Sequence, residues 1–328
     1  MNRPWSWIFV ALAWGALALA VEAAPLELVE KIPLGEVKGR LDHLTVDIPR
    51  QRLLLAELGN GTVGVVDLRE SRVLRRLTGF SEPQGIAYVP SADAVYVANG
   101  GDGTVRVLRG DDFTESGRIE LGDDADNVRV DTAADRVYVG FGSGGIAVID
   151  PKTRARAGEL PLPYHPEGFQ LETGGSRIFV NVPRAKGIVV LDRVAGRPVA
   201  TWPLAGGTAN FPMEFDRTNR RILVALRSPA RLNVFAAADG SLVASEELCG
   251  DADDVFWDAK RRRVYVSCGE GFIEAFEERG RKYRSLGRIP TAAGARTALL
   301  VPEWDRLYLA VRASSGVPAA IWTYRLVP

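Results

Sequence analysis

The chain has 328 residues, and 41 lysines and arginines balance 41 aspartates and glutamates, which gives a formal net charge of zero. A neutral chain has no overall field that would draw it onto nucleic acid or an anionic membrane surface, so we expect no nucleic-acid partner. The 34 glycines and 19 prolines are spread along the chain. This distribution is typical of many short strands joined by tight turns.

The first 23 residues differ from the rest of the sequence. Arg3 precedes an apolar run from Ile8 to Val21, and Ala23 supplies a small residue at the expected cleavage point. This pattern predicts a signal peptide at residues 1–23 and one mature domain at residues 24–328. We therefore expect a periplasmic or secreted protein that does not insert into a membrane after cleavage. The alternative is an uncleaved membrane anchor, for which the run is short because a span needs about 20 apolar residues.

Seven variants of one apolar segment follow at intervals of 41 to 44 residues. They begin at Arg52, Ala94, Arg136, Arg177, Arg221, Arg263 and Arg306. One apolar segment precedes each of them across a polar turn, and further strand-like segments follow across Gly-rich turns. Four short strands in about 42 residues form one blade of a β-propeller.

The sequence thus predicts an all-β, seven-bladed β-propeller of four-stranded antiparallel blades. The seventh repeat stops after its third strand, at residues 320–324, whereas residues 28–34 read as a strand without a repeat of its own. We expect the N-terminal strand to complete the C-terminal blade, because a ring closed in this way leaves no edge strand open to pairing.

The repeat at Val95-Tyr96-Val97-Ala98-Asn99, followed by Asp102-Gly103-Thr104-Val105, resembles the YVTN family of β-propeller repeat proteins. The resemblance extends over roughly residues 26 to 328 and implies a periplasmic, WD40-like propeller with seven blades. Related propellers include cofactor-carrying subunits of dehydrogenases, lactonases, metal-dependent lyases and interaction modules. The resemblance therefore leaves the activity open.

The loops that enter the first strand of each blade should meet on one face of the ring, at the mouth of the central channel. Six-residue windows in these loops hold nine acidic and three basic residues, so we expect an acidic rim that attracts a cation. The candidate ligand-binding residues are Asp42, Gln84, Asn127, Asn210, Asp254 and Arg296. The candidate ligands of one divalent cation are Asp126, Glu167 and Asp253, since hard cations accept carboxylates. Turn capping is the structural alternative for each of these side chains.

Two functions fit these loops. The first is a monomeric binding or scaffold propeller that holds a small ligand or a periplasmic protein partner over the channel mouth. The second is a metal-dependent lyase or lactonase, in which His43 or His165 acts as general acid or base and Arg296 steadies a carboxylate or an oxyanion. These are the chain's two histidines, and both fall in entry loops. Residue types alone leave open whether the protein is an enzyme.

Cys249 and Cys268 are the two cysteines of the chain, and both map to loops of the sixth blade on the same face. A disulfide between them is sterically plausible and would suit an oxidising compartment. Two free buried thiols are the alternative.

Overall fold

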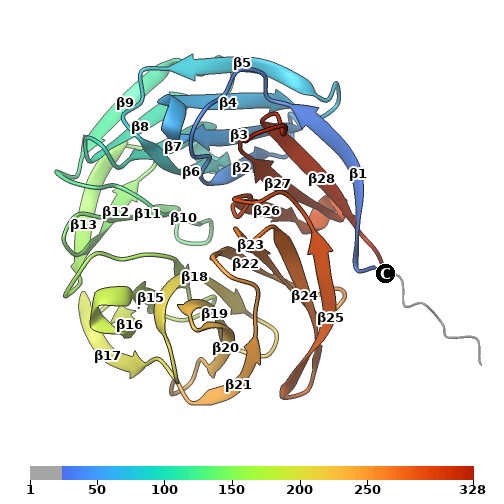
Figure 1. Ribbon diagram of the computed structural model, residues 1–328. Helices are drawn as coiled ribbons and strands as arrows, with labels where there is room; N and C mark the ends of the chain where they lie inside the picture. The colour runs from blue at the N-terminus through green and yellow to red at the C-terminus, as the bar shows by residue number, and fades with distance from the viewer. Residues whose placement is uncertain (1–23) are drawn as a thin grey trace, which may run out of the picture.

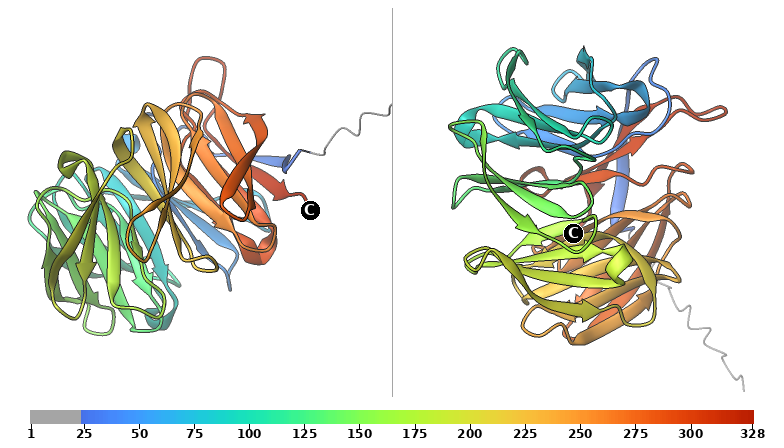
Figure 2. Two further views of the ribbon diagram at one scale, coloured as in Figure 1. Left: turned by 90° about the horizontal axis from the view of Figure 1, so that it is seen from below. Right: turned by 90° about the vertical axis from the view of Figure 1, so that its left-hand side faces the viewer.

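Residues 24–328 form a closed ring of seven four-stranded sheets in this computed structural model (Figure 1). Each sheet is one blade, and the side views in Figure 2 show the blades as twisted sheets packed face to face around the ring. The all-β, seven-bladed propeller that the repeats predict is therefore confirmed. The predicted signal peptide, residues 1–23, lies outside the described residues and stays a prediction.

The first four blades follow the repeats in chain order. Their strands are β2 (Leu44–Asp47), β3 (Arg52–Glu57), β4 (Thr62–Asp67) and β5 (Arg72–Thr78) in blade 1; β6 (Pro83–Val89), β7 (Ala94–Asn99), β8 (Thr104–Arg109) and β9 (Glu115–Glu120) in blade 2; β10 (Val128–Asp131), β11 (Arg136–Phe141), β12 (Gly145–Asp150) and β13 (Ala155–Pro161) in blade 3; and β14 (Phe169–Leu171), β15 (Arg177–Val182), β16 (Gly187–Asp192) and β17 (Arg197–Pro203) in blade 4.

The last three blades continue the same order. Their strands are β18 (Thr208–Asp216), β19 (Arg221–Ser228), β20 (Ala230–Ala236) and β21 (Leu242–Glu247) in blade 5; β22 (Ala252–Asp258), β23 (Arg263–Cys268), β24 (Phe272–Arg279) and β25 (Lys282–Pro290) in blade 6; and β26 (Ala298–Val301), β27 (Arg306–Val311), β28 (Ala320–Leu326) and β1 (Leu26–Pro33) in blade 7. Short 3-10 turns are η1 (Leu58–Asn60), η2 (Pro90–Ala92), η3 (Pro183–Ala185) and η4 (Pro302–Trp304).

The ring closes as the sequence predicts. Strand β1 pairs antiparallel with β28, from Leu26 opposite Leu326 to Pro33 opposite Ala320 (Figure 1). The N-terminal strand thus covers the edge that β28 would otherwise expose, and it joins the two ends of the described chain in one sheet.

The core lies between neighbouring blades. All six residues of β7 are buried, whereas the outer strand β13 has a single buried residue. Tyr96 of β7 is fully buried and belongs to one apolar cluster with Val137 and Val139 of the next blade. Because each fully buried side chain of this size contributes roughly 2 kcal/mol, the stacking of blades is what stabilises sheets that could not fold singly.

The first strands of the blades surround the central channel, so their starting points define its mouth (Figure 1). The loops that enter these strands and the first residues of the strands themselves carry every candidate site residue named from the sequence except the two cysteines. The fold therefore gathers residues that are up to about 250 positions apart in the chain at one face of the ring.

Candidate functional site

A small cleft lies at the mouth of the channel, between the entry loops of blades 1, 3, 4, 5 and 6. Its volume is about 40 Å³. It is lined by Arg40, Asp42, His43, Asp126, Asn127, Arg129, Glu167, Gly168, Phe211, Pro212, Met213, Asp253 and Asp254. Five of these residues are acidic, and together with His43 and Asn127 they are the predicted residues that the structure brings together. We call this cleft the carboxyl cleft.

Two of the five carboxyl groups already have basic partners. Asp253 forms ion pairs with Arg227 and, at 2.9 Å, with Arg296. Arg40 Nη2 lies 2.8 Å from Asp42 Oδ2 as an ion pair, and this buried oxygen accepts no hydrogen bond among the described residues. Burial outweighs these arginines and raises the pKa of both aspartates.

The third carboxyl group, Asp254, is held by the backbone. Its Oδ2 accepts a hydrogen bond of 2.8 Å from the amide nitrogen of Ala298 in the neighbouring blade 7. Burial nevertheless raises the pKa of Asp254 well above its usual range. Asp254 thus links two first strands as well as lining the cleft.

The remaining two, Asp126 and Glu167, have no ion pair with any lysine or arginine among residues 24–328. Asp126 is 8% exposed and accepts a hydrogen bond of 3.2 Å from the side-chain amide of Asn127. Burial, followed by the carboxylates of Asp42 and Glu167, raises the pKa of Asp126 well above its usual range. Burial, followed by Asp253, raises the pKa of Glu167 to about 7. These two are the carboxyl groups of the cleft that have neither an ion pair nor a hydrogen bond from a backbone amide among the described residues.

His43 and His165 lie in different surroundings. His43 lines the cleft, and burial followed by the charge of Arg129 lowers its pKa to about 4, so its imidazole is neutral at pH 7. His165 is outside the lining residues, and its Nδ1 donates to the carbonyl oxygen of Gly142 at 2.6 Å. The structure therefore does not bring the two histidines together at one reacting centre.

Two other predicted ligand-binding residues also lie outside the carboxyl cleft. Asn210 is fully buried, and its side-chain amide donates to Asn181 Oδ1 at 2.9 Å and to the carbonyl oxygen of Gly187 at 3.0 Å. Gln84 donates to Asp124 Oδ1 at 3.2 Å, on the rim between blades 2 and 3. Both side chains donate hydrogen bonds to the neighbouring blade, whereas a turn cap would accept one from the backbone of its own loop.

The predicted metal set does not fit this geometry. Within residues 24–328, no three His, Cys, Asp or Glu side chains are placed to hold a metal ion. Asp253 is paired with two arginines, which leaves Asp126 and Glu167 as two carboxyl groups without a third ligand. We therefore derive no reaction step through a bound cation.

The sequence reasoning missed two charges that lie deeper in the channel. Below the carboxyl cleft lies a cavity of about 310 Å³, and one equivalent residue from each of the seven first strands lines it, the residue that pairs with the third residue of the second strand. In chain order, from blade 1 to blade 7, these residues are Thr45, Ala87, Arg129, Gln170, Glu214, Phe256 and Leu299. Three consecutive blades contribute polar side chains and the others contribute mainly apolar ones. Extending the alignment of the repeats two residues beyond the entry loops would have revealed Arg129 and Glu214.

Arg129 of blade 3 and Glu214 of blade 5 both line the polar side of this cavity. Arg129 Nε donates to the carbonyl oxygen of Phe169 at 3.1 Å, and its guanidinium carbon lies 5.5 Å from the centre of the Phe169 ring. Burial lowers the pKa of Arg129, and the carboxyl groups of Glu214 and Asp254 act against this. Burial raises the pKa of Glu214 to about 7, against the hydrogen bond from the amide of Phe215 and the charge of Arg129.

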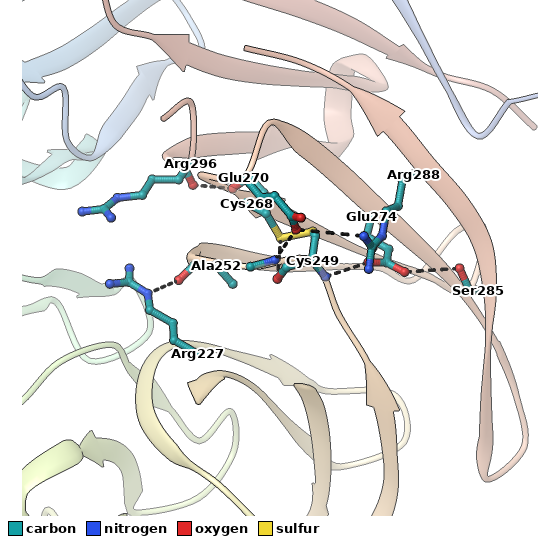
Figure 3. Close-up of a disulfide and its surroundings, with 11 residues drawn as sticks. Arg227, Cys249, Ala252, Cys268, Glu270, Glu274, Ser285, Arg288 and Arg296 are labelled. Atoms are coloured by element: carbon teal, nitrogen blue, oxygen red, sulfur yellow. Dashed lines mark hydrogen bonds and ion pairs between the residues drawn. A yellow bond between two sulfur atoms is a disulfide. The ribbon is translucent and has the colours of Figure 1, made fainter. Parts of the chain in front are cut away.

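A disulfide anchors the segment, formed by the loop before β22 and the start of β22, that carries three of the acidic residues of this face. Cys249 and Cys268 are bonded, fully buried, and have Cα atoms 5.9 Å apart. The Cys249 amide also donates to Glu274 Oε2 at 2.8 Å, and Arg227 Nε donates to the Ala252 carbonyl oxygen at 2.8 Å (Figure 3). Figure 3 shows both arginine side chains, Arg227 and Arg296, extending away from the Glu274 side of the disulfide.

No membrane-spanning helix occurs in the part of the chain that the structure describes, since none of its helices has the necessary length and hydrophobicity.

Comparison with known proteins identifies a fold. No protein-family model and no curated protein matches the chain. Among solved structures it is similar to Kuenenia stuttgartiensis hydrazine synthase, with a TM-score of 0.76 and 18% identity over 88% of this chain and 97% of that chain. It is also similar to a chain in the crystal structure of the mitotic checkpoint complex, with a TM-score of 0.78 and 12% identity over 98% of each chain. At these identities the similarity shows the propeller fold, and the YVTN resemblance stays a prediction.

Proposed function

We propose that the protein is an exported binding propeller that holds a small ligand by a cationic group at the carboxyl cleft. The observation that carries this proposal is the pair of the buried Asp126 and the half-buried Glu167, two carboxyl groups without an ion-pair partner among residues 24–328. The related scaffold role, in which a protein partner inserts a cationic side chain, uses the same chemistry.

The energetics favour a cation over a neutral ligand. A carboxylate in a low-dielectric site is costly unless a charge or several hydrogen bonds compensate it. The acidic neighbours of Asp126 raise its pKa further, and at Glu167 the charges of Arg227 and Arg40 do not offset burial and Asp253. An incoming ammonium or guanidinium group would ionise both carboxyl groups and form charge-assisted hydrogen bonds with them. Arg227 is held over the Phe211 ring at 4.1 Å and paired with Asp253, so it does not fill this role.

Export rests on two features. Residues 1–23 have the pattern of a signal peptide, and the disulfide between Cys249 and Cys268 is a bond that persists in oxidising compartments. We expect the intact mass of protein recovered from a periplasmic extract or culture medium to lack residues 1–23. An unprocessed mass in a membrane fraction would favour the uncleaved anchor instead.

The binding proposal is tested by calorimetric titration with methylammonium, putrescine and agmatine. We expect at least one of these amines to bind, and the double variant Asp126→Asn, Glu167→Gln to bind it at least about tenfold more weakly, because hydrogen bonds to charged groups contribute about 1.5–3 kcal/mol. The matched control is Glu303→Gln, which removes an exposed carboxylate from the turn η4 on the opposite face. Equal affinity of the wild type and the double variant would contradict the proposal, as would no binding by any of the three amines.

A further inference from the structure

A second cleft opens on the same face, beside the carboxyl cleft and between blades 7 and 1. Its volume is about 70 Å³. It is lined by Arg40, Leu41, Asp251, Gly294, Arg296, Ala310 and Arg312. Three guanidinium groups thus meet one carboxylate, which reverses the charge balance of the neighbouring carboxyl cleft. We call it the arginine cleft.

Two of its three arginines have acidic partners. Arg296 Nη1 lies 2.7 and 2.8 Å from the two carboxylate oxygens of Asp251, and Arg296 Nε lies 2.9 Å from Asp253. Arg40 faces Asp42 at 2.8 Å. These pairs fix the two guanidinium groups in place at the border between the clefts, and Arg40 lines both of them.

Arg312 is different because it has no ion pair with any acidic side chain in the described residues. It follows β27, and its side chain lies against Gly294 of the opposite loop. A Cβ atom at position 294 would be 2.4 Å from Arg312 Nε, and the φ of Gly294 is +80°. Glycine at this position therefore lets the guanidinium lie over the loop and face the cleft.

We propose that Arg312, with Arg40 and Arg296, forms a subsite for an oxyanion, either a carboxylate or a phosphate, and that the ligand of this face is a small molecule carrying both an amine and an oxyanion. The amine half of this inference rests on the proposed function; the oxyanion half stands on the arginine cleft alone. Guanidinium groups bind planar and tetrahedral oxyanions through paired N–H donors. The volume of the cleft suits one such group, since a single water needs roughly 10–15 Å³.

The oxyanion subsite is tested first with inorganic phosphate and with acetate, which carry no amine. Calorimetric titration should show binding of one of them to the wild type, and Arg312→Gln should weaken it at least about tenfold through loss of a charge-assisted contact. The control is Arg69→Gln, which removes an exposed arginine in the turn between β4 and β5 on the opposite face. Binding that Arg312→Gln leaves unchanged would overturn the subsite, as would no binding of either anion, provided that thermal unfolding shows the variants folded.

The bipolar ligand is tested with a series of ω-amino acids from glycine to 6-aminohexanoate, each compared with the alkylamine of the same chain length. We expect one chain length at which the amino acid binds at least about tenfold more tightly than its alkylamine, and we expect Arg312→Gln to abolish this difference. Equal affinities at every length would overturn the inference. Phosphate binding that depends on Arg312, without any amine binding, would reject the proposed function and leave the oxyanion subsite standing.

Discussion

At the scale of single residues, the channel is lined by carboxyl groups that are partly or fully removed from water and have no ion pair with a basic side chain among the described residues. Asp126, Glu167 and Glu214 all have raised pKa values, and burial is the first cause in each case. A folded-state pKa above the unfolded one means that the native protein holds a proton that the unfolded chain has lost. The contribution of such a group to the free energy of unfolding is fully present at low pH, and it is lost as the pH rises through the folded-state pKa.

Glu214 allows a direct test of this dependence of stability on pH. Its pKa is about 7 in the folded protein against an ordinary value of 4.5, a difference worth roughly 3 kcal/mol. We expect Glu214→Gln to leave the free energy of unfolding nearly unchanged at pH 4.5 and to raise it at pH 8, where the wild type carries a buried charge. Urea unfolding at a series of pH values measures this. A constant difference between variant and wild type from pH 4.5 to 8 would show that Glu214 titrates normally.

The position of the site could be predicted at this scale, but its chemistry could not. Aligning the entry loops by repeat identified Asp126, Glu167 and Asp254 as residues of the channel mouth, because the start of each first strand must lie there. The pairing of Asp253 with Arg227 could not be read in the same way, since Arg227 comes from the end of β19 in another blade. Which carboxyl groups are left without a partner depends on such contacts between blades.

At the scale of elements, the loop between β21 and β22 illustrates how the fold positions the site. It carries Asp251, and β22 continues it with Asp253 and Asp254, so one short segment supplies acids to both clefts. The disulfide ties the start of this segment to Cys268, the last residue of β23. Fixing the segment at this point holds its carboxylates against Arg227 and Arg296.

We expect the double variant Cys249→Ser, Cys268→Ser to lose about 3 kcal/mol of unfolding free energy, because the bond closes a loop of intermediate length in the unfolded chain. We also expect weaker amine binding, since the acidic segment would no longer be anchored. Denaturant unfolding and calorimetry measure the two effects, and wild-type protein treated with a reductant should shift in the same direction. Unchanged stability and affinity would mean that the hydrogen bonds from the loop amides to Glu274 and Glu270 are enough to hold the loop.

At the scale of the whole molecule, the repeats predicted nearly everything about the fold. Seven copies of one buried strand, and a seventh repeat short of its fourth strand, were enough to predict the blade number and the closure by β1. The repeats do not encode function in the same way, because a binding site in a ring arises where the copies differ. Arg129 and Glu214 are such differences, at positions where the other blades have uncharged side chains.

Ring closure makes a prediction for the intact fold. Removing residues 24–33 would delete β1 and expose the edge of β28, which β1 covers by antiparallel pairing. We expect this truncated protein to unfold at a lower temperature and to associate through the open edge. Size-exclusion chromatography and thermal unfolding of both forms provide the measurement. A truncated chain that stays monomeric with unchanged thermal stability would show that closure by β1 contributes little.

Carbon-13 NMR of the carboxyl groups in protein labelled at Glu and Asp shows whether Asp126 and Glu167 await a cation. The Glu167→Gln variant assigns the Glu167 signal. We expect Glu167 to titrate with a pKa of about 7 in the free protein and at a clearly lower pH once an amine ligand is bound. A Glu167 that titrates near 4.5 in the free protein, or whose titration an amine at saturating concentration does not move, would contradict this expectation.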